Sequence, residues 1–196
     1  MLILASQSKS RQEMLDAAGV EFTVVSAGID EDAVRDRSRA EGDTSKEASM
    51  KLALAKAMAV SEQHPDAYVI GADQILDLNG EWFSKPENLS MAHKHLKKLR
   101  NKSHLLVNGI AVVKNKKVIW CDNSVVKVTM RDFSDNFLDD YLAEAGEEVC
   151  ESVGAYYLED LGAQLVKSID GDFFSVLGLP LLPLLDCLRS CGELQK

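Results

Sequence analysis

The chain begins with a strand-like segment that stops in a polar, basic turn and then continues as a helix. Residues 2–4 are an apolar run, and residues 12–18 carry apolar side chains at helical spacing before Gly19. Hydroxyl groups, cations and the free N–H groups of a helix N-terminus together suit a phosphate, although an ordinary serine N-cap gives the same pattern. The turn contains Ser6, Ser8, Lys9, Ser10 and Arg11.

The same alternation of strand and helix patterns continues along the chain, and it favours a mixed α/β (α+β) fold. No repeat or linker interrupts it, so we expect one domain over residues 1–196. The polar, charged segment from Gly28 to Asp43 is expected to be a mobile loop. Further strands are expected over 22–26, 67–70, 75–78, 81–83, 105–113, 117–130 and 164–169. A tight turn at Asn115 and Lys116 should join 105–113 and 117–130 in an antiparallel hairpin. Further helices are expected over 44–62, 90–100 and 134–145, and from Pro180 onward. Thr44 and Glu47 should form a capping box at the first of these helices, and Ser90 and Ser134 should cap the next two.

Charge and cysteine content exclude several classes of protein. The net charge is −9, and binding nucleic acid or a membrane surface requires a broad basic face, so we expect neither partner. The first residues resemble no export signal, which favours a cytoplasmic protein. The four cysteines have no CxxC spacing, so reduced thiols are expected rather than a zinc site or disulfides.

Two charged residues outside the opening turn are candidates for chemistry. Asp73 follows the apolar segment 67–70, and the small residues Gly71 and Ala72 leave room for a ligand beside its carboxylate, although a turn or cap residue fits equally well. Lys85 lies in a rigid dipeptide with the proline that follows it.

Five stretches of this sequence together resemble the Maf family of nucleoside triphosphate pyrophosphatases, which are also described as septum-formation inhibitors. The resemblance covers nearly the whole chain in the right order, and it is specific because several motifs match together. The matching stretches are LASQSKSR at 4–11, IGADQ at 70–74, SKP at 84–86, VGAYYLEDLGAQLV at 153–166 and GDFFSVLGLPL at 171–181.

The resemblance implies a fold and a reaction. The fold would be an elongated, two-lobed Maf/ITPase-like structure with a central twisted mixed sheet and a cleft between the lobes. The enzyme would be a hydrolase that cleaves a nucleoside triphosphate between the α and β phosphates, releasing a nucleoside monophosphate and pyrophosphate. A divalent metal ion, usually Mg²⁺, would assist. The resemblance also suggests a homodimer.

The resemblance assigns roles to particular residues of this sequence. Asp73 matches the proton acceptor, which would deprotonate a metal-polarised water. Glu31 matches the family's DE motif and is the metal-ligand candidate, since Mg²⁺ commonly takes only one or two protein carboxylates. Lysines such as Lys56 usually lie on the solvated face of a helix, but here the resemblance includes it among the phosphate-binding residues. That phosphate-binding set is Ser6, Ser8, Arg11, Lys56 and Lys85.

The sequence departs from the family pattern at several positions. Lys9 and Ser10 replace the common proline and first arginine of SPRR, and lysine cannot reproduce an arginine fork. Gln74 and Glu159, which we include among the substrate-binding residues, resemble the branch that acts on 7-methylguanosine triphosphate. The sequence Gly-Ala-Tyr at 154–156 resembles the pyrimidine branch instead, so the base stays open.

Two other classes of function remain as alternatives. A non-catalytic nucleotide-binding regulator of cell division would keep the phosphate turn, but it could lose Asp73, which is present. Nucleophilic catalysis through Cys121 or Cys150 would need a histidine partner, and the sequence places none evidently nearby.

Overall fold

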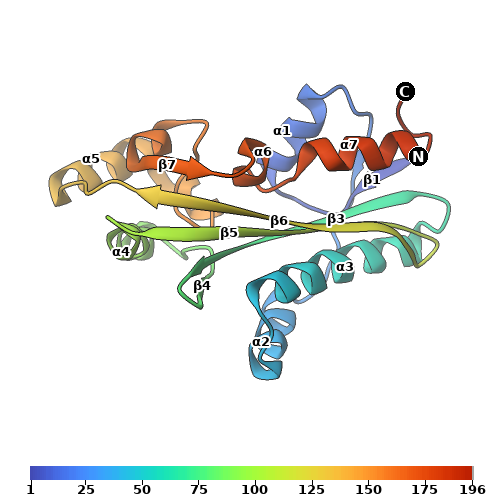
Figure 1. Ribbon diagram of the computed structural model, residues 1–196, viewed down its shortest axis with the longest axis horizontal. Coiled ribbons are helices and arrows are strands. Elements are labelled where there is room, and N and C mark those ends of the chain that lie inside the picture. The colour runs from blue at the N-terminus through green and yellow to red at the C-terminus, as the bar shows by residue number, and fades with distance from the viewer. Residues whose placement is uncertain (196) are drawn as a thin grey trace. The chain divides into compact units, whose positions relative to one another are not determined.

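A computed structural model describes residues 1–195, and one mixed sheet runs through it (Figure 1). The strand order is β2-β1-β3-β5-β6-β7, with β4 paired to β3. Strand β1 is parallel to both β2 and β3, whereas β4 is antiparallel to β3 and β7 is antiparallel to β6. This arrangement confirms the predicted mixed α/β fold. The strands are β1 (Leu2–Leu4), β2 (Thr23–Val24), β3 (Tyr68–Leu78), β4 (Glu81–Phe83), β5 (Ser103–Lys114), β6 (Lys117–Met130) and β7 (Val166–Asp170).

The helices begin largely where the sequence predicts. The side chains of Thr44 and Glu47 form the expected capping box, whereas Asn88 rather than Ser90 caps the helix near residue 90. No helix within residues 1–195 is long and apolar enough to span a bilayer. The α-helices are α1 (Lys9–Ala17), α2 (Glu31–Glu41), α3 (Ser45–Gln63), α4 (Leu89–Leu99), α5 (Asp135–Ala145), α6 (Phe173–Val176) and α7 (Leu181–Ser190). Two 3₁₀ helices, η1 (Gly146–Glu151) and η2 (Leu161–Leu165), precede β7.

The chain divides into two compact units, each assembled from separate segments. The first contains Met1–Gln74, Val107–Ser124 and the residues from Gly178 onward, and the second contains Ile75–Leu106 and Val125–Leu177. Strands β3, β5 and β6 contribute residues to both units. The single-domain organisation and the cleft implied by the family resemblance stay predictions.

Helix α3 packs exceptionally close to the sheet of the first unit because two strand residues there are glycines. A Cβ atom on Gly71 would lie 2.1 Å from the carbonyl oxygen of Ala53, and one on Gly109 would lie 2.3 Å from that of Ser49. Neither distance is sterically possible, so larger residues would push α3 away from β3 and β5. Because α3 lies this close, its buried face contacts β3 at Gly71, directly after Ile70.

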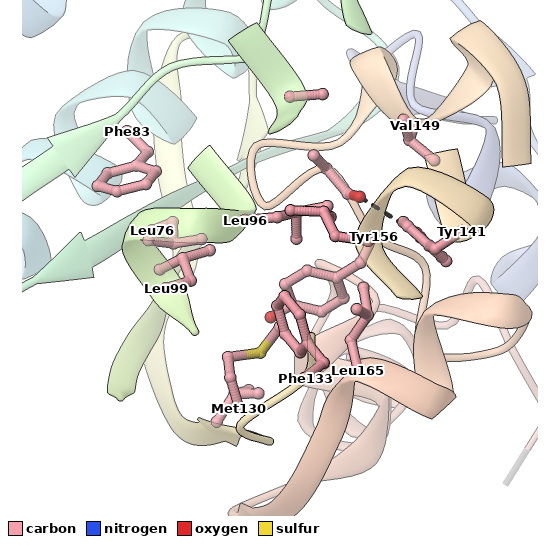
Figure 2. Close-up of a cluster of buried hydrophobic side chains, with 14 of the residues drawn as sticks. Leu76, Phe83, Leu96, Leu99, Met130, Phe133, Tyr141, Val149, Tyr156 and Leu165 are labelled. Atoms are coloured by element: carbon pink, nitrogen blue, oxygen red, sulfur yellow. Dashed lines mark hydrogen bonds between the residues drawn. The ribbon is translucent and has the colours of Figure 1, made fainter. Parts of the chain in front are cut away.

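The second unit has its own apolar core, formed by side chains from β3, β5 and β6 together with α4 and α5 (Figure 2). The hydroxyl of Tyr141 donates to the carbonyl of Ala155 at 3.2 Å, which satisfies a polar group inside this core. His104 Nε2 and the hydroxyl of Tyr156 lie 2.8 Å apart and are likewise buried. The loop before η2 is therefore tied to the core by two tyrosine hydroxyls.

The prediction of a mobile loop between Gly28 and Asp43 is wrong, because α2 occupies most of this segment. The carboxylate of Asp30 accepts from the N–H of Ala33 at 2.9 Å and caps the helix, and Gly42 ends it in the left-handed conformation. Helix α2 packs against α3. Few apolar residues mark the buried face of α2, so the sequence pattern does not indicate a helix here.

The predicted position of Asp73 at the end of a strand is also wrong. Strand β3 continues from Tyr68 to Leu78, so Asp73 lies in the middle of it. The shorter expected strands 67–70 and 75–78 are the two ends of this one element. Strand β1 pairs with β3 only as far as Ile70, so the edge of β3 that faces β1 is no longer paired with β1 at Asp73. The strand predicted over 22–26 is reduced to Thr23–Val24.

Candidate active site

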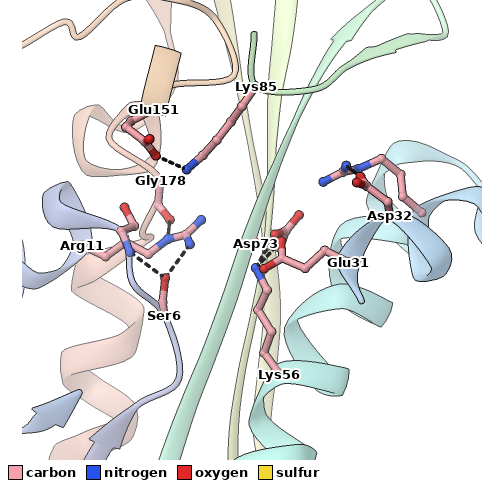
Figure 3. A network of polar contacts seen from close by, with 11 residues as sticks. Ser6, Arg11, Glu31, Asp32, Lys56, Asp73, Lys85, Glu151 and Gly178 are labelled. Atoms are coloured by element: carbon pink, nitrogen blue, oxygen red, sulfur yellow. Dashed lines mark hydrogen bonds and ion pairs between the residues drawn. The ribbon is translucent and has the colours of Figure 1, made fainter. Parts of the chain in front are cut away.

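One buried lysine joins two carboxylates in the first unit (Figure 3). Lys56 Nζ lies 2.8 Å from Asp73 Oδ1 and 2.8 Å from Glu31 Oε2. Lys56 and Asp73 are both buried, whereas the Glu31 side chain is 45% exposed. The expectation that Lys56 would lie on a solvated helix face is therefore wrong, and the phosphate-binding role that the family resemblance assigns to it stays a prediction.

Three elements bring this cluster together. Lys56 lies on the buried face of α3, one turn after Leu52 and one before Val60. Asp73 lies on the same face of β3 as Gly71, because side chains alternate along a strand, and Gly71 contacts α3. Glu31 is the first residue of α2.

The second carboxylate oxygen of Asp73, Oδ2, indicates that the cluster of Lys56, Asp73 and Glu31 lacks a ligand. Asp73 Oδ2 is buried and has no hydrogen-bond partner within residues 1–195. A buried carboxylate oxygen without a donor is costly, so a cation, a water or a substrate group would stabilise it. Two carboxylates facing one ammonium group also leave one net negative charge.

These residues fit a divalent cation. No group of three histidine, cysteine, aspartate or glutamate side chains in the described chain could enclose a metal ion. Mg²⁺ needs only one or two protein carboxylates when phosphate oxygens and waters complete its shell. Glu31, the predicted metal ligand, is one such carboxylate, and it contacts the same Lys56 Nζ as Asp73.

The opening turn holds its arginine through two contacts. Arg11 Nε donates to the carbonyl of Gly178 at 2.7 Å, and Arg11 Nη1 donates to Ser6 Oγ at 3.0 Å. Ser6 Oγ also accepts from the N–H of Ser8 at 3.3 Å. Burial lowers the pKa of the Arg11 guanidinium below its usual value, and the negative charges of Asp73 and Glu31 oppose that shift. Arg11 is therefore electrostatically coupled to the carboxylate cluster.

Gly178 is a contributor to this arrangement that inspection of the sequence missed. It adopts a φ of +100°, which disfavours other residues, and its carbonyl fixes the Arg11 side chain. The GLPL stretch within the family resemblance was the only signal, and it does not indicate which atom acts.

The other predicted site residues lie in different surroundings. Gln74 Nε2 donates to Asn108 Oδ1 at 3.1 Å, on the strand next to its own. Lys85 belongs to the second unit and pairs with Glu151 at 2.8 Å, where both side chains are exposed. Glu159 is an exposed residue of the second unit, between η1 and η2. The roles predicted for Gln74, Lys85 and Glu159 stay predictions.

Comparison with known proteins places the chain in a family. A family model described as Maf-like protein matches residues 1–191. A nucleoside triphosphate pyrophosphatase of Paramagnetospirillum magneticum is 49% identical over 98% of this chain and 99% of its own length. A 7-methyl-GTP pyrophosphatase of Brucella abortus is 43% identical over 96% of this chain and 94% of its own length, and one of Rhizobium meliloti is 42% identical over 99% and 98%. The chain therefore belongs to the Maf-like family.

Proposed function

We propose that this protein is a nucleoside triphosphate pyrophosphatase, a hydrolase that cleaves the anhydride between the α and β phosphates. The observation that carries the proposal is the cluster of Lys56, Asp73 and Glu31, in which the buried Asp73 Oδ2 has no hydrogen-bond partner within residues 1–195. The names of relatives that match nearly the full length of the chain support the same reaction.

In this proposal, Asp73 is the general base. Its unpartnered Oδ2 accepts a proton from the attacking water, and the resulting hydroxide forms a bond to one phosphorus of the α–β anhydride. The bridging oxygen then leaves with the other phosphorus, so the products are a nucleoside monophosphate and pyrophosphate. Lys56, held 2.8 Å from Asp73 Oδ1, keeps the carboxylate oriented through this step.

Glu31 would hold the divalent metal ion, Mg²⁺ in our proposal, and phosphate oxygens and waters would complete its shell. When bound, such an ion polarises water and neutralises phosphate charge. Arg11 adds a positive charge whose side chain is already fixed by Gly178 and Ser6, so it loses little conformational freedom on binding a phosphate. Ser8, Lys85, Gln74 and Glu159 complete the substrate-binding set as predictions from the family resemblance.

The substrate base is left open between pyrimidine and 7-methylguanine nucleotides. Some relatives are named for nucleoside triphosphates in general and others for 7-methyl-GTP. The test is to measure pyrophosphate release with Mg²⁺ from dTTP, UTP, CTP, ATP and 7-methyl-GTP. Strong turnover of one class supports the proposal and identifies the base. Binding of these nucleotides without release of pyrophosphate from any of them would contradict it and favour the non-catalytic regulator. The cytoplasmic location and the homodimer also stay proposals.

A further inference from the structure

Helix α2 carries a cation, Arg35, that the proposed mechanism does not use. The side chain of Arg35 is only 11% exposed, and its Nε atom is buried without a hydrogen-bond partner among residues 1–195. Its Nη1 atom donates to Asp32 Oδ1 at 2.8 Å. The Asp32 side chain is 83% exposed, so the partner of this largely buried guanidinium lies in solvent.

The guanidinium of Arg35 lies at the same end of α2 as Glu31. Side chains of an α-helix lean toward its N-terminus, and residues four apart share one face. Arg35 follows Glu31 by four residues, and its bond to Asp32 shows that its side chain turns back to the first turn of the helix. Glu31 in that turn contacts Lys56, which also contacts Asp73. Arg35 therefore lies on the same face of α2 as Glu31, which is the face that contacts the cluster of Lys56, Asp73 and Glu31.

The contacts of Arg35 suit an exchange of partners. Ion pairs with an exposed carboxylate contribute little stability, so Asp32 is released readily. A buried N–H group without an acceptor is costly, which favours any ligand that supplies an oxygen to Nε. The planar fork of an arginine offers two parallel donors, and the oxygens of a phosphate match this spacing. Lys56, by contrast, already contacts two carboxylates.

We propose that Arg35 is a substrate-binding residue that exchanges Asp32 for oxygens of the phosphate chain. This inference rests on the proposed function, because it assumes that the cluster of Glu31, Lys56 and Asp73 binds a nucleoside triphosphate. It adds to that function a contact from α2 to the phosphates, so α2 helps to form the binding site as well as carrying Glu31.

The test compares variants at Arg35 with a matched arginine on the same helix. Arg35→Met should raise KM about tenfold with a smaller change in kcat, because an arginine–phosphate contact contributes to binding of the substrate. Arg35→Lys should give an intermediate KM, since it keeps the charge and loses the fork. Arg37→Met alters an exposed arginine two residues further on and should leave KM unchanged.

Asp32→Asn separates substrate binding from a structural role. Releasing Arg35 from its carboxylate should lower KM about two- to fivefold, and this gain should disappear in the Arg35→Met background. If Arg35 served only to hold α2 through Asp32, Asp32→Asn and Arg35→Met would lower thermal stability to the same extent, and Asp32→Asn would not lower KM. That result would overturn the proposal.

Binding of inorganic pyrophosphate with Mg²⁺, measured by calorimetry without turnover, distinguishes this inference from the proposed function. Weaker pyrophosphate binding by folded Arg35→Met and Arg35→Lys, with tighter binding by Asp32→Asn, supports the inference even if no nucleotide is hydrolysed. Equal pyrophosphate binding by wild type and all three variants would overturn the inference even if the wild type hydrolyses nucleotides.

Discussion

Lys56 Nζ lies 2.8 Å from Asp73 Oδ1, and both side chains are buried against the sheet. The lysine comes from helix α3 and the aspartate from the middle of β3, so the ion pair joins the helix to the strand. Because Asp73 Oδ2 has no hydrogen-bond partner in the part of the chain that the structure describes, the pair leaves one carboxylate oxygen available to a ligand. The proposed chemistry and part of the stability of the first unit therefore depend on the same two residues.

The first prediction concerns Asp73 as the general base. Asp73→Asn should lower kcat for pyrophosphate release by about 10²–10⁴-fold, because the amide cannot accept the proton from water. Nucleotide binding, measured by calorimetry, should persist. Asp66→Asn, at an exposed aspartate just before β3, serves as the control and should retain full activity. Undiminished turnover by Asp73→Asn would remove Asp73 from the mechanism.

The second prediction concerns the stability provided by Lys56. Lys56→Met leaves a buried carboxylate at Asp73 without its cation, and this should lower the free energy of unfolding by about 3–5 kcal/mol. The matched control is Lys51→Met on the same helix, where the lysine is 43% exposed and pairs with Glu41 and Asp43. That change should cost at most about 1 kcal/mol. Urea denaturation of both variants measures the difference, and equal losses would show that burial of the Lys56 pair does not matter.

The third prediction concerns the acid stability of the second unit. Burial lowers the pKa of His104 from its ordinary value of 6.5 to about 4. Between these two values, the unfolded chain binds a proton on His104 while the folded chain does not, so falling pH favours unfolding. The contribution of the neutral histidine to the free energy of unfolding is fully present above pH 6.5. It is lost progressively as the pH falls toward 4.

This dependence should disappear in His104→Gln, which can keep a hydrogen bond to the hydroxyl of Tyr156. Between pH 7 and pH 4.5, the wild type should lose about 2 kcal/mol more of its unfolding free energy than the variant does. His64→Gln, at a half-exposed histidine, should follow the wild type. An equal loss of unfolding free energy between pH 7 and pH 4.5 in the wild type and in His104→Gln would contradict the prediction.

The fourth prediction concerns the N-cap of α2. Asp30→Ala removes the acceptor for the N–H of Ala33 and should weaken the helix by about 1 kcal/mol, which corresponds to about fivefold faster amide exchange along α2. Serine is also a good N-cap, so Asp30→Ser should exchange at nearly the wild-type rate. Hydrogen exchange followed by mass spectrometry on peptides from this segment tests both. Unchanged exchange in Asp30→Ala would show that packing on α3 alone holds α2.

Local patterns explain why most elements were predictable. Hydrophobic periodicity and capping residues depend on neighbours within a few positions, so the capping box at Thr44 and the N-cap at Ser134 appear in the sequence and in the structure alike. The turn at Asn115 and Lys116 likewise joins the long antiparallel strands as expected. Helix α2 was missed because its buried face carries Arg35 and Ser38, which do not look apolar in the sequence.

The sequence alone determined the fold class, most of the helices and strands, and the family, because these depend on local periodicity and on ordered motifs. Only the tertiary structure decided that Lys56 is buried, because its partner Asp73 lies 17 residues away on a different element. It also decided that Arg11 is held by Gly178, which is 167 residues away. Contacts at such separations depend on how the sheet brings its strands together, and no local pattern encodes them.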